Sequence, residues 1–288
     1  MSEECRLDLK FWGVRGSTPT PLIENLNYGG NTPCVEVRLP DNEVLILDGG
    51  TGIRNLGNSL IKEFQGQELD LKVFLTHFHW DHIQGIPFFQ PLYRAENKVT
   101  FYSFPFPENG AYRRVGAVQG LEEALKCQMT DPYFPIPFDF LPAQKEYIEI
   151  APEPIKFGPL TIHPFHLNHP GNSYGYRLEC EGTSIVYATD LEHGSQEHDR
   201  VLREYCEGTD FLIFDSQFTP EDYPKHNGWG HSTWLEACKV ANDSRVKRLA
   251  LFHHNPTYTD HRFFGIVQKA RRKFENIMGA QEGFTISL

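Results

Sequence analysis

The sequence has no apolar run close to the roughly 20 residues that a membrane-spanning helix requires. Its first residues, MSEECRLDLKFWGVRG, carry early acids and lack the apolar segment of a signal peptide. With 40 % hydrophobic and 23 % charged residues in a chain of 288, the composition is that of a globular protein with a sizeable core. We therefore expect a soluble, cytoplasmic protein with no membrane partner.

Cysteine pairs with metal-binding or redox spacing are also missing. The chain has six cysteines, but they include no C-x-x-C pair and form no dense framework. We expect reduced thiols, although the even number leaves disulfides open. The positions are Cys5, Cys34, Cys127, Cys180, Cys206 and Cys238.

Positive charge is scarce. The formal net charge is −11, and the only dense basic cluster is KARRKF at residues 269–274. Such a cluster is more often an exposed helix face than a binding site. Proteins that bind long nucleic acids usually present a basic face, because neutralisation of phosphates dominates that binding. The charge balance therefore predicts a small substrate and no long nucleic acid.

Low-complexity linkers and charge blocks that would separate domains are absent as well. No G-x-G-x-x-G fingerprint lies between a predicted strand and a helix, which argues against a dinucleotide site. We expect a single domain over residues 1–288, with a loop-rich insertion at about 101–158. This insertion is rich in proline and aromatic residues and contains a predicted short helix over LEEALKCQ, residues 121–128. Its aromatic side chains could cover the core, form a dimer interface or stack on a base.

The sequence does contain a series of short apolar runs that end in aspartate or histidine. Continuous apolar runs of this length are typical of strands buried on both faces. In layered α/β proteins, the ends of such strands commonly build the functional site. The runs are VLILD to Asp48, KVFLTH to His77, SIVYATD to Asp190, FLIFD to Asp215 and LALFH to His253.

The stretch THFHWDH, residues 76–82, concentrates metal-binding side chains. In extended backbone His77 and His79 point the same way, and Asp81 and His82 follow in a predicted turn or helix start. Imidazole and carboxylate groups suit zinc, manganese and iron. A site with two metal ions needs more ligands than this loop supplies, so other residues must contribute.

The chain has thirteen histidines, and the residue pattern alone leaves several of them open as further ligands. Asp190 ends a predicted strand and, as a carboxylate, could bridge two metal ions. Either His253 or His254 ends the last clear strand. The stretch HPFHLNHPG offers further candidates in His163, His166 and His169.

The motif H-x-H-x-D-H, followed in order by His169, Asp190 and His253, resembles the metallo-β-lactamase superfamily over essentially the whole chain. The resemblance extends to GVRGSTPTP, YGGNTPCVEV, LDGGTG and GWGHST. With LALFHH, it looks like the phosphodiesterase branch, which contains the tRNA 3′-processing ribonuclease Z enzymes and small cyclic-nucleotide phosphodiesterases. This implies an α/β fold, a four-layer αβ/βα sandwich of two mixed sheets with outer helices, and a homodimer.

The resemblance also implies two divalent metal ions, with zinc as the first candidate and manganese or iron as alternatives. It favours His169 among the histidines of HPFHLNHPG, and His253 over His254. The implied ligands are His77, His79 and His169 for one ion and Asp81, His82 and His253 for the other, with Asp190 between them.

Two such ions, about 3.5–4 Å apart, can hold a bridging hydroxide at neutral pH and neutralise charge on a phosphoryl group. Asp81 is our candidate for the group that positions the attacking water or receives its proton. We expect Asp48 to hydrogen-bond the metal-binding loop without touching an ion.

The stretch GWGHSTWLEACKV points to phosphorus chemistry. Thr233 and Glu236 form a T-x-x-E capping box at a predicted helix start, which places His231 beside backbone N–H groups that favour an anion. His231 could donate a hydrogen bond to a phosphate oxygen or protonate a leaving alcohol. The resemblance likewise implies that this histidine acts on the phosphate. The alternative is a histidine that merely caps the helix. Asp215 could orient His231 or simply finish its strand.

These observations favour a dinuclear metal-dependent phosphodiesterase that acts on a small phosphodiester, with 3′,5′-cyclic nucleotides as the best candidate. The first alternative is a ribonuclease-Z-type tRNA nuclease. The short hairpin between His169 and Asp190 leaves no room there for the long arm with which those enzymes hold tRNA. A lactone or thioester hydrolase on the same fold is the second alternative. A structural metal protein is disfavoured, because structural zinc sites usually rely on cysteines.

Overall fold

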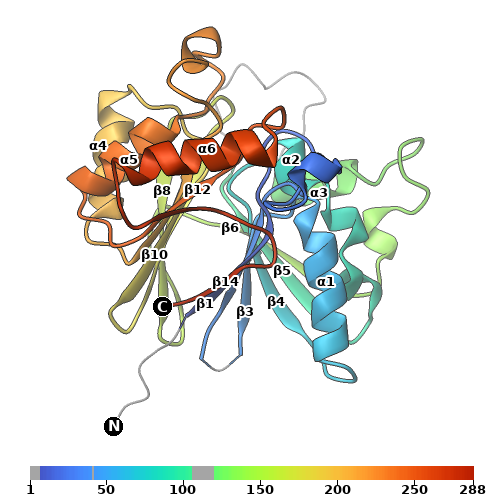
Figure 1. The fold of residues 1–288 in the computed structure, drawn as a ribbon. Coiled ribbons are helices and arrows are strands. Elements are labelled where there is room, and N and C mark those ends of the chain that lie inside the picture. Colours follow the sequence, from blue (N-terminus) through green and yellow to red (C-terminus); the bar gives the residue numbers. More distant parts are fainter. Residues whose placement is uncertain (1–6, 41, 106–119) are drawn as a thin grey trace.

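The structure, a computed structural model, describes residues 7–40, 42–105 and 120–288. Within these residues two seven-stranded mixed sheets pack face to face (Figure 1). The strands of the first sheet are β1 (Asp8–Gly13), β2 (Cys34–Arg38), β3 (Val44–Leu47), β4 (Asp70–Phe74), β5 (Lys98–Ser103), β6 (Gln144–Glu149) and β14 (Thr285–Ser287). Those of the second are β7 (Ile155–Phe157), β8 (Leu160–Leu167), β9 (Ser173–Cys180), β10 (Thr183–Ala188), β11 (Phe211–Asp215), β12 (Leu249–Phe252) and β13 (Ile277–Gly279).

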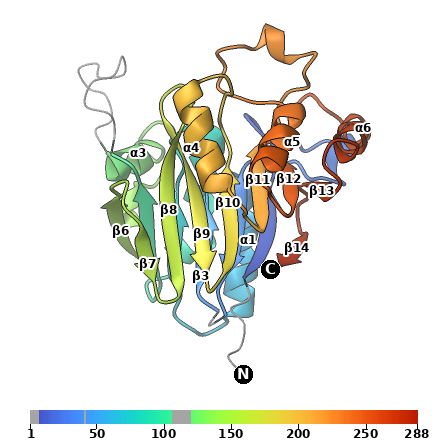
Figure 2. The same cartoon turned by 90° about the vertical axis from the view of Figure 1, so that its left-hand side faces the viewer.

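Helices cover the outer faces of both sheets. The α-helices are α1 (Gly52–Glu63), α2 (Trp80–Ile83), α3 (Leu121–Cys127), α4 (Gln196–Cys206), α5 (Trp234–Asp243) and α6 (Asp260–Arg271). The 3₁₀ helices are η1 (Ile23–Asn25), η2 (Ile86–Phe88), η3 (Gln90–Tyr93), η4 (Phe138–Phe140) and η5 (Tyr223–Lys225). Helices α4 and α5 lie on the outer face of the second sheet (Figure 2). The result is the four-layer αβ/βα sandwich that the sequence predicted.

Hydrophobic clusters fill the interfaces between these layers. The central cluster joins the inner faces of the two sheets, with Leu47 of β3 and Ile185 of β10 among its members. A second cluster packs Leu202 of α4 against the outer face of the second sheet. A third packs Leu56 of α1, with Ile46 of β3, on the outer face of the first sheet. Each sheet is therefore buried on both faces.

This double burial explains the continuous apolar runs of the sequence. In β11, Phe211 and Ile213 belong to the central cluster, whereas Leu212 and Phe214 belong to the outer one. Because side chains alternate between the two faces, a strand buried on both sides needs an apolar residue at every position. The predicted strands all exist, as β3, β4, β10, β11 and β12, and each polar residue lies at or just beyond a strand end.

Those strand ends are brought together by parallel pairing. β3 pairs parallel with β4, and β10, β11 and β12 pair parallel in succession. The carboxyl ends of parallel neighbours lie at the same edge of a sheet, so the polar residues of each sheet form a row. Because the two sheets pack face to face, the row of polar residues of one sheet lies next to that of the other.

The expectation of a loop-rich insertion at 101–158 was wrong in part. The predicted helix is present as α3, but β5, β6 and β7 also fall in or reach into this range. β6 has no buried residue, because it is the edge strand of its sheet, so it lacks the apolar pattern by which a strand is recognised. Residues 106–119 of the insertion lie outside the described residues.

Two further expectations concern thiols and membranes. Of the cysteines that the structure describes, Cys34, Cys127, Cys206 and Cys238 are free thiols, as expected, whereas Cys180 is disulfide-bonded. Cys5 lies outside the described residues. In the described ranges, no helix is both long and apolar enough to cross a membrane.

Arg15 ties the amino-terminal loop to the carboxy-terminal part of the chain. Its guanidinium is fully buried and donates to the carbonyl oxygens of Gly29 (2.8 Å) and Tyr258 (2.8 Å). It also pairs with the Asp260 carboxylate at 3.3 Å, at the start of α6. Because a buried cation needs such partners, this one side chain fixes three segments relative to one another.

We expect Arg15→Met to lower the free energy of unfolding by about 3–5 kcal/mol, because it leaves the buried Asp260 carboxylate without its cation. Urea unfolding monitored by circular dichroism measures the change. Arg200→Met is the matched control, since Arg200 is exposed and only pairs with Glu204 one turn away on α4. The control should cost no more than about 0.5 kcal/mol. Equal losses in the two variants would contradict the role given to Arg15.

Candidate metal centre

The side chains predicted as metal ligands lie together where the strand ends of the two sheets meet. The first sheet contributes the loop after β4, which runs into α2. The second sheet contributes the residues that follow β8, β10 and β12. The ligand atoms fall into groups of mutually close nitrogen and oxygen atoms, each within 4.8 Å of one another.

The first group consists of His77, His79, His169 and Asp190. The Nδ1 atom of His79 lies 3.1 Å from Nε2 of His169. Oδ1 of Asp190 lies 3.8 Å from Nε2 of His77 and 3.9 Å from Nε2 of His169. His79 is exposed whereas the other three are buried, so the group opens to solvent on the His79 side.

The second group consists of Asp81, His82 and His253. Oδ2 of Asp81 lies 3.4 Å from Nε2 of His82 and 3.2 Å from Nε2 of His253. Oδ2 of Asp190 lies 3.1 Å and 3.3 Å from the same two nitrogens. Asp190 therefore faces the first group with one carboxylate oxygen and the second group with the other.

The protonation pattern of these histidines fits a bound cation. His82 uses Nδ1 to donate to Asp48 (2.9 Å), and His253 uses Nδ1 to donate to the Gln217 side-chain oxygen (2.8 Å). Their Nε2 lone pairs then face each other at 3.4 Å. In addition, Nε2 of His77 is buried and has no hydrogen-bond partner among the residues that the structure describes. Facing lone pairs and an orphaned buried nitrogen are unfavourable unless a cation lies among them.

The electrostatics of the site point the same way. Burial lowers the pKa of His77, and that of His169 to about 4, so both rings are neutral and offer a lone pair. Burial also opposes charge on His82, but the carboxylates of Asp190 and Asp81 outweigh it and raise its pKa well above the usual value. The carboxylates of Asp190 and Asp81 therefore stabilise a positive charge beside His82. The donor set suits zinc, manganese or iron.

Asp48 holds the metal-binding loop from behind. Its carboxylate accepts hydrogen bonds from the backbone N–H of Thr76 (2.8 Å) and the hydroxyl of Tyr187 (2.8 Å), besides that from His82. The Thr76 hydroxyl in turn lies 2.9 Å from Nδ1 of His77. This contact orients the ring so that Nε2 points into the site. The sequence alone gave no sign of Thr76 or Tyr187, because both look like ordinary strand residues.

The strand ends leave their sheets through unusual backbone turns. Asp48, Asp190 and His253 have φ angles of 63°, 56° and 58°. This left-handed conformation is uncommon for residues with a side chain, and aspartate and histidine tolerate it better than most. Non-glycine residues held in this way cluster at functional sites, because the surrounding structure must enforce them. Each turn ends its strand abruptly and aims the side chain along the sheet edge.

His231 lies beside the two groups, directly before α5. Its Nδ1 lies 2.8 Å from Oδ2 of Asp215 and 3.8 Å from Oδ1 of Asp190. Burial opposes protonation of the ring, but the Asp215 carboxylate outweighs it and raises the pKa of His231. Thr233 caps α5 by accepting from the backbone N–H of Glu236 at 3.1 Å, as the capping box predicts. The reciprocal half of the box is replaced by contacts of the Glu236 carboxylate with Arg203 and Lys239.

A third set of close atoms joins Asp190, Asp215, His231 and His253. It is a poorer candidate for an ion, because its members already have partners. The Asp215 carboxylate accepts from the backbone N–H groups of Asp190, Gln217 and Ser232 in addition to the His231 ring. Asp215 therefore orients His231 and the adjacent backbone.

Comparison with known proteins gives the family. A family model described as beta-lactamase superfamily domain matches residues 45–254. The chain belongs to the beta-lactamase superfamily. It is 26 % identical to a ribonuclease Z of Thermoplasma acidophilum, over 92 % of this chain and 91 % of the relative.

The fold is shared with solved members of the superfamily. The metallo-β-lactamase fold protein YhfI from Bacillus subtilis superposes with a TM-score of 0.71 at 19 % identity, covering 99 % of this chain and 100 % of that protein. A diphosphatase from the PhnP family superposes with a TM-score of 0.67 at 20 % identity, covering 97 % of each chain. The family and these structures support the expected α/β sandwich and a metal-dependent hydrolase.

The remaining histidines lie outside the two groups of this superfamily member. His254 follows His253 but turns away, packing on the rings of Phe263 and Tyr28 with its Nε2 3.1 Å from the Leu251 carbonyl. The other open candidates have different neighbours: His163 contacts Glu179, and His166 contacts His198. Among the described residues, His253 and His169 are thus the alternatives that reach the site.

Glu192 is a supporting residue that the sequence did not reveal. Its carboxylate accepts from the backbone N–H groups of Gly228 (2.7 Å) and Gly230 (2.8 Å). The Gly230 carbonyl in turn accepts from Nδ1 of His169 at 2.7 Å. Gly230 has φ of +84°, and a Cβ there would lie 2.3 Å from the His169 ring. Glu192 therefore fixes the loop that both orients His169 and carries His231.

Gly16, in the stretch GVRGSTPTP, makes a close approach to His253. A Cβ at this position would lie 2.4 Å from Nδ1 of His253 and 2.7 Å from the side-chain oxygen of Gln217. Any larger residue must displace the His253 ring or break its hydrogen bond to Gln217. The neighbouring Ser17 donates its backbone N–H to Asp81 at 2.7 Å, so this loop supports two predicted ligands.

We expect Gly16→Ala to weaken metal binding by roughly 10- to 100-fold, the usual loss when a contact that orients a ligand is removed. Competition for zinc between the protein and a chromophoric chelator measures the affinity. The matched control is Gly265→Ala on α6, where a Cβ would meet nothing within 4 Å. Wild-type affinity in both variants would show that the His253 ring does not bind the metal.

Proposed function

We propose that this metal-dependent hydrolase cleaves a small phosphodiester, with 3′,5′-cyclic nucleotides as the preferred candidate. We further propose that it uses two divalent ions, zinc being the first candidate. Their ligands would be the two groups described above, with Asp190 between them. Bound ions of this kind activate water and neutralise charge on the phosphoryl oxygens.

The observation that carries the proposal is the placement of His231. Its ring is nearly buried, receives its orientation from Asp215, and lies beside Asp190 rather than within either ligand group. Its raised pKa keeps it protonated over a wider pH range, which suits donation to a phosphate oxygen or to the leaving alcohol. Ester bonds with poor leaving groups, such as the ribose oxygen of a cyclic nucleotide, benefit most from such a donor.

Asp81 is the candidate for the group that positions the attacking water or receives its proton. Burial by itself raises the pKa of this carboxyl, but His82 and His253 outweigh it and hold the pKa well below the usual range. Asp81 therefore remains ionised. The N–H of Ser17 holds its Oδ2 atom, which fixes the direction in which the carboxylate can accept a proton from water.

The second candidate function is ribonuclease-Z-like tRNA 3′-processing, favoured by the name of the Thermoplasma acidophilum relative. This relative does not fit our expectation that no long nucleic acid binds. Two observations support the small substrate instead. β9 and β10 are joined by only Glu181 and Gly182, so no arm is inserted between His169 and Asp190. The net charge of −11 disfavours a polyanion.

A lactone or thioester hydrolase is a weaker alternative, because acyl chemistry gives no reason for a protonated His231 oriented by Asp215. The homodimer implied by the resemblance and the cytoplasmic location expected from the sequence remain proposals. Light scattering coupled to gel filtration tests the first, and fractionation of the source cells tests the second.

The function is tested with protein loaded in turn with zinc and manganese. The substrates are 3′,5′-cyclic nucleotides, 2′,3′-cyclic nucleotides, bis(p-nitrophenyl) phosphate, a precursor tRNA, a lactone and a thioester. The readout is release of the hydrolysis product of each. We expect turnover of a 3′,5′-cyclic nucleotide that Asp190→Ala abolishes, because this substitution removes a ligand from both groups. Trimming of the precursor tRNA without cyclic-nucleotide turnover would instead support tRNA 3′-processing, the second candidate function. Faster hydrolysis of a lactone or thioester would overturn both.

The role of His231 has its own test. We expect His231→Ala to lower kcat on a cyclic nucleotide by roughly 10²- to 10⁴-fold, the usual contribution of a positioned proton donor. Metal content, measured by atomic absorption, should not change. On bis(p-nitrophenyl) phosphate the loss should be much smaller, because nitrophenolate leaves without a proton. An equal loss on both substrates would argue that His231 binds phosphate rather than protonating the leaving group.

A further inference from the structure

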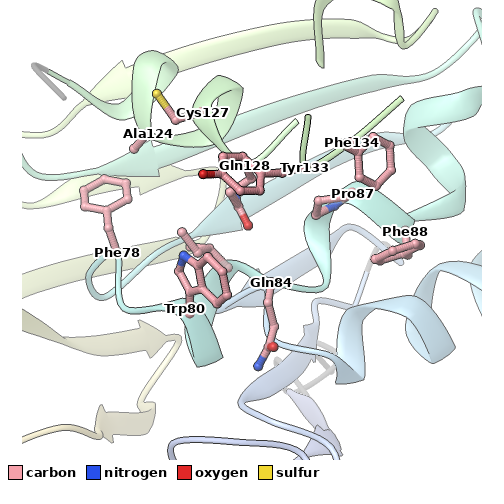
Figure 3. A pocket seen from close by; sticks show the side chains of 11 residues that line it. Phe78, Trp80, Gln84, Pro87, Phe88, Ala124, Cys127, Gln128, Tyr133 and Phe134 are labelled. Atoms are coloured by element: carbon pink, nitrogen blue, oxygen red, sulfur yellow. The ribbon is translucent and has the colours of Figure 1, made fainter. Parts of the chain in front are cut away.

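An aromatic pocket adjoins the metal-binding loop. It has a volume of about 790 Å³, which is within the usual range of roughly 300–1,000 Å³ for small-molecule sites. Phe78 and Trp80 line it from the loop itself (Figure 3). Gln128, Tyr133 and Phe134 line it from the segment that follows α3. The insertion and the metal-binding loop thus form opposite walls of one pocket.

The pocket is directly connected to the proposed ligands through the chain. Trp80 is the residue between His79 and Asp81, and Phe78 is the residue between His77 and His79. Consecutive Cα atoms are about 3.8 Å apart. Lining residues of the pocket and proposed ligands therefore alternate within one short segment of the chain. His79 and Trp80 are both exposed, so one proposed ligand and one wall of the pocket are accessible to a substrate.

The chemistry of the pocket suits a neutral, flat ligand. Its walls include several aromatic rings, among them the edge-to-face pair of Phe88 and Phe134, with ring centroids 5.8 Å apart. Trp80 and Tyr133 are 77 % and 83 % exposed, so their faces are available for stacking. None of the described lining residues is charged. A phosphate would find no counter-charge here, whereas an aromatic ring would find faces on which to stack.

A polar atom in this apolar setting indicates how such a ring would be recognised. Nε2 of Gln128 is buried and has no hydrogen-bond partner in the part of the chain that the structure describes. An unsatisfied buried amide donor is costly, and a ligand that presents an acceptor would satisfy it. Nucleobases combine a flat aromatic face with ring nitrogen and carbonyl acceptors at the edge.

We propose that this pocket binds the nucleobase of the substrate, with Trp80 as the stacking surface and the Gln128 amide as a donor to the base edge. The proposal rests on the proposed function in that the base belongs to the phosphodiester that the metal centre cleaves. It divides the site in two: the ligands, His231 and Asp81 act on the phosphate, and the aromatic pocket selects what the phosphate carries.

The first measurement is independent of catalysis. Zinc-loaded protein is mixed in turn with adenosine, guanosine, cytidine and uridine, which carry no phosphate, and binding is followed by saturation-transfer NMR. We expect at least one nucleoside to bind, and Trp80→Ala and Gln128→Ala to weaken that binding. The matched control is Phe140→Ala, because Phe140 is a 75 % exposed aromatic of the same insertion that does not line the pocket. If no nucleoside binds, the proposal is overturned.

The second measurement uses turnover of the cyclic nucleotide and of ribose 3′,5′-cyclic phosphate, which has no base. Loss of stacking in Trp80→Ala should raise KM for the nucleotide by roughly 5- to 100-fold and remove its advantage over the baseless substrate. Phe140→Ala should retain that advantage. Metal content of each variant is measured in parallel, so that a lost ion is not mistaken for a lost base contact.

The two proposals fail in different ways. Nucleoside binding that depends on Trp80, without cleavage of any phosphodiester, would leave the pocket standing and refute the phosphodiesterase. Efficient turnover of cyclic nucleotides, with the same preference over the baseless substrate in Trp80→Ala as in the unaltered protein, would uphold the enzyme and refute the pocket.

Discussion

The convergence of imidazole lone pairs and carboxylates on a small buried volume is the constraint on which the rest of this structure depends. Facing nitrogens such as Nε2 of His82 and His253, 3.4 Å apart, are unfavourable unless a proton or a metal ion lies between them. The protein must therefore hold them in place against their own electrostatics. It does so by placing them at the ends of strands whose other residues are buried on both faces. The free energy of the core thus maintains an arrangement that is locally unfavourable.

Neither sheet alone contains a complete ligand group. The loop after β4 supplies His77, His79, Asp81 and His82, whereas His169, Asp190 and His253 come from the second sheet. The central hydrophobic cluster between the sheets is therefore what assembles the site. A layer of polar support then sets the orientations: Asp48 fixes the first sheet's loop, and Asp215 and Glu192 fix the second sheet's side. Each of these carboxylates accepts hydrogen bonds from backbone N–H groups. The orientation of the supported side chains therefore depends on the local backbone conformation.

The surroundings of the metal centre differ in polarity from one side to the other. Around His231 lie carboxylates, ring nitrogens and the start of α5, which together suit a charged group. On the side of Trp80 lie aromatic rings and neutral amides. Both sides are attached to the segments that carry the proposed ligands, so the proposed substrate would present its phosphate and its neutral part in a fixed order. The acidic net charge of the chain is compatible with the proposed function, in which only a local site receives the phosphate.

The sequence by itself determined the five strands that lead to aspartate or histidine, the H-x-H-x-D-H loop and the helix start after His231. Apolar runs buried on both faces, a dense H-x-H-x-D-H motif and a capping threonine are local patterns, and local physics fixes what they form. It could not decide between His253 and His254, reveal the strands of the 101–158 insertion, or identify Glu192, Gly16 and Gln217 as supports. These features depend on contacts between residues that are distant in the sequence and meet at a sheet edge or at an interface between layers. The left-handed turn at His253 sends one histidine into the site and the next between Tyr28 and Phe263, and only contacts between distant segments enforce such a turn.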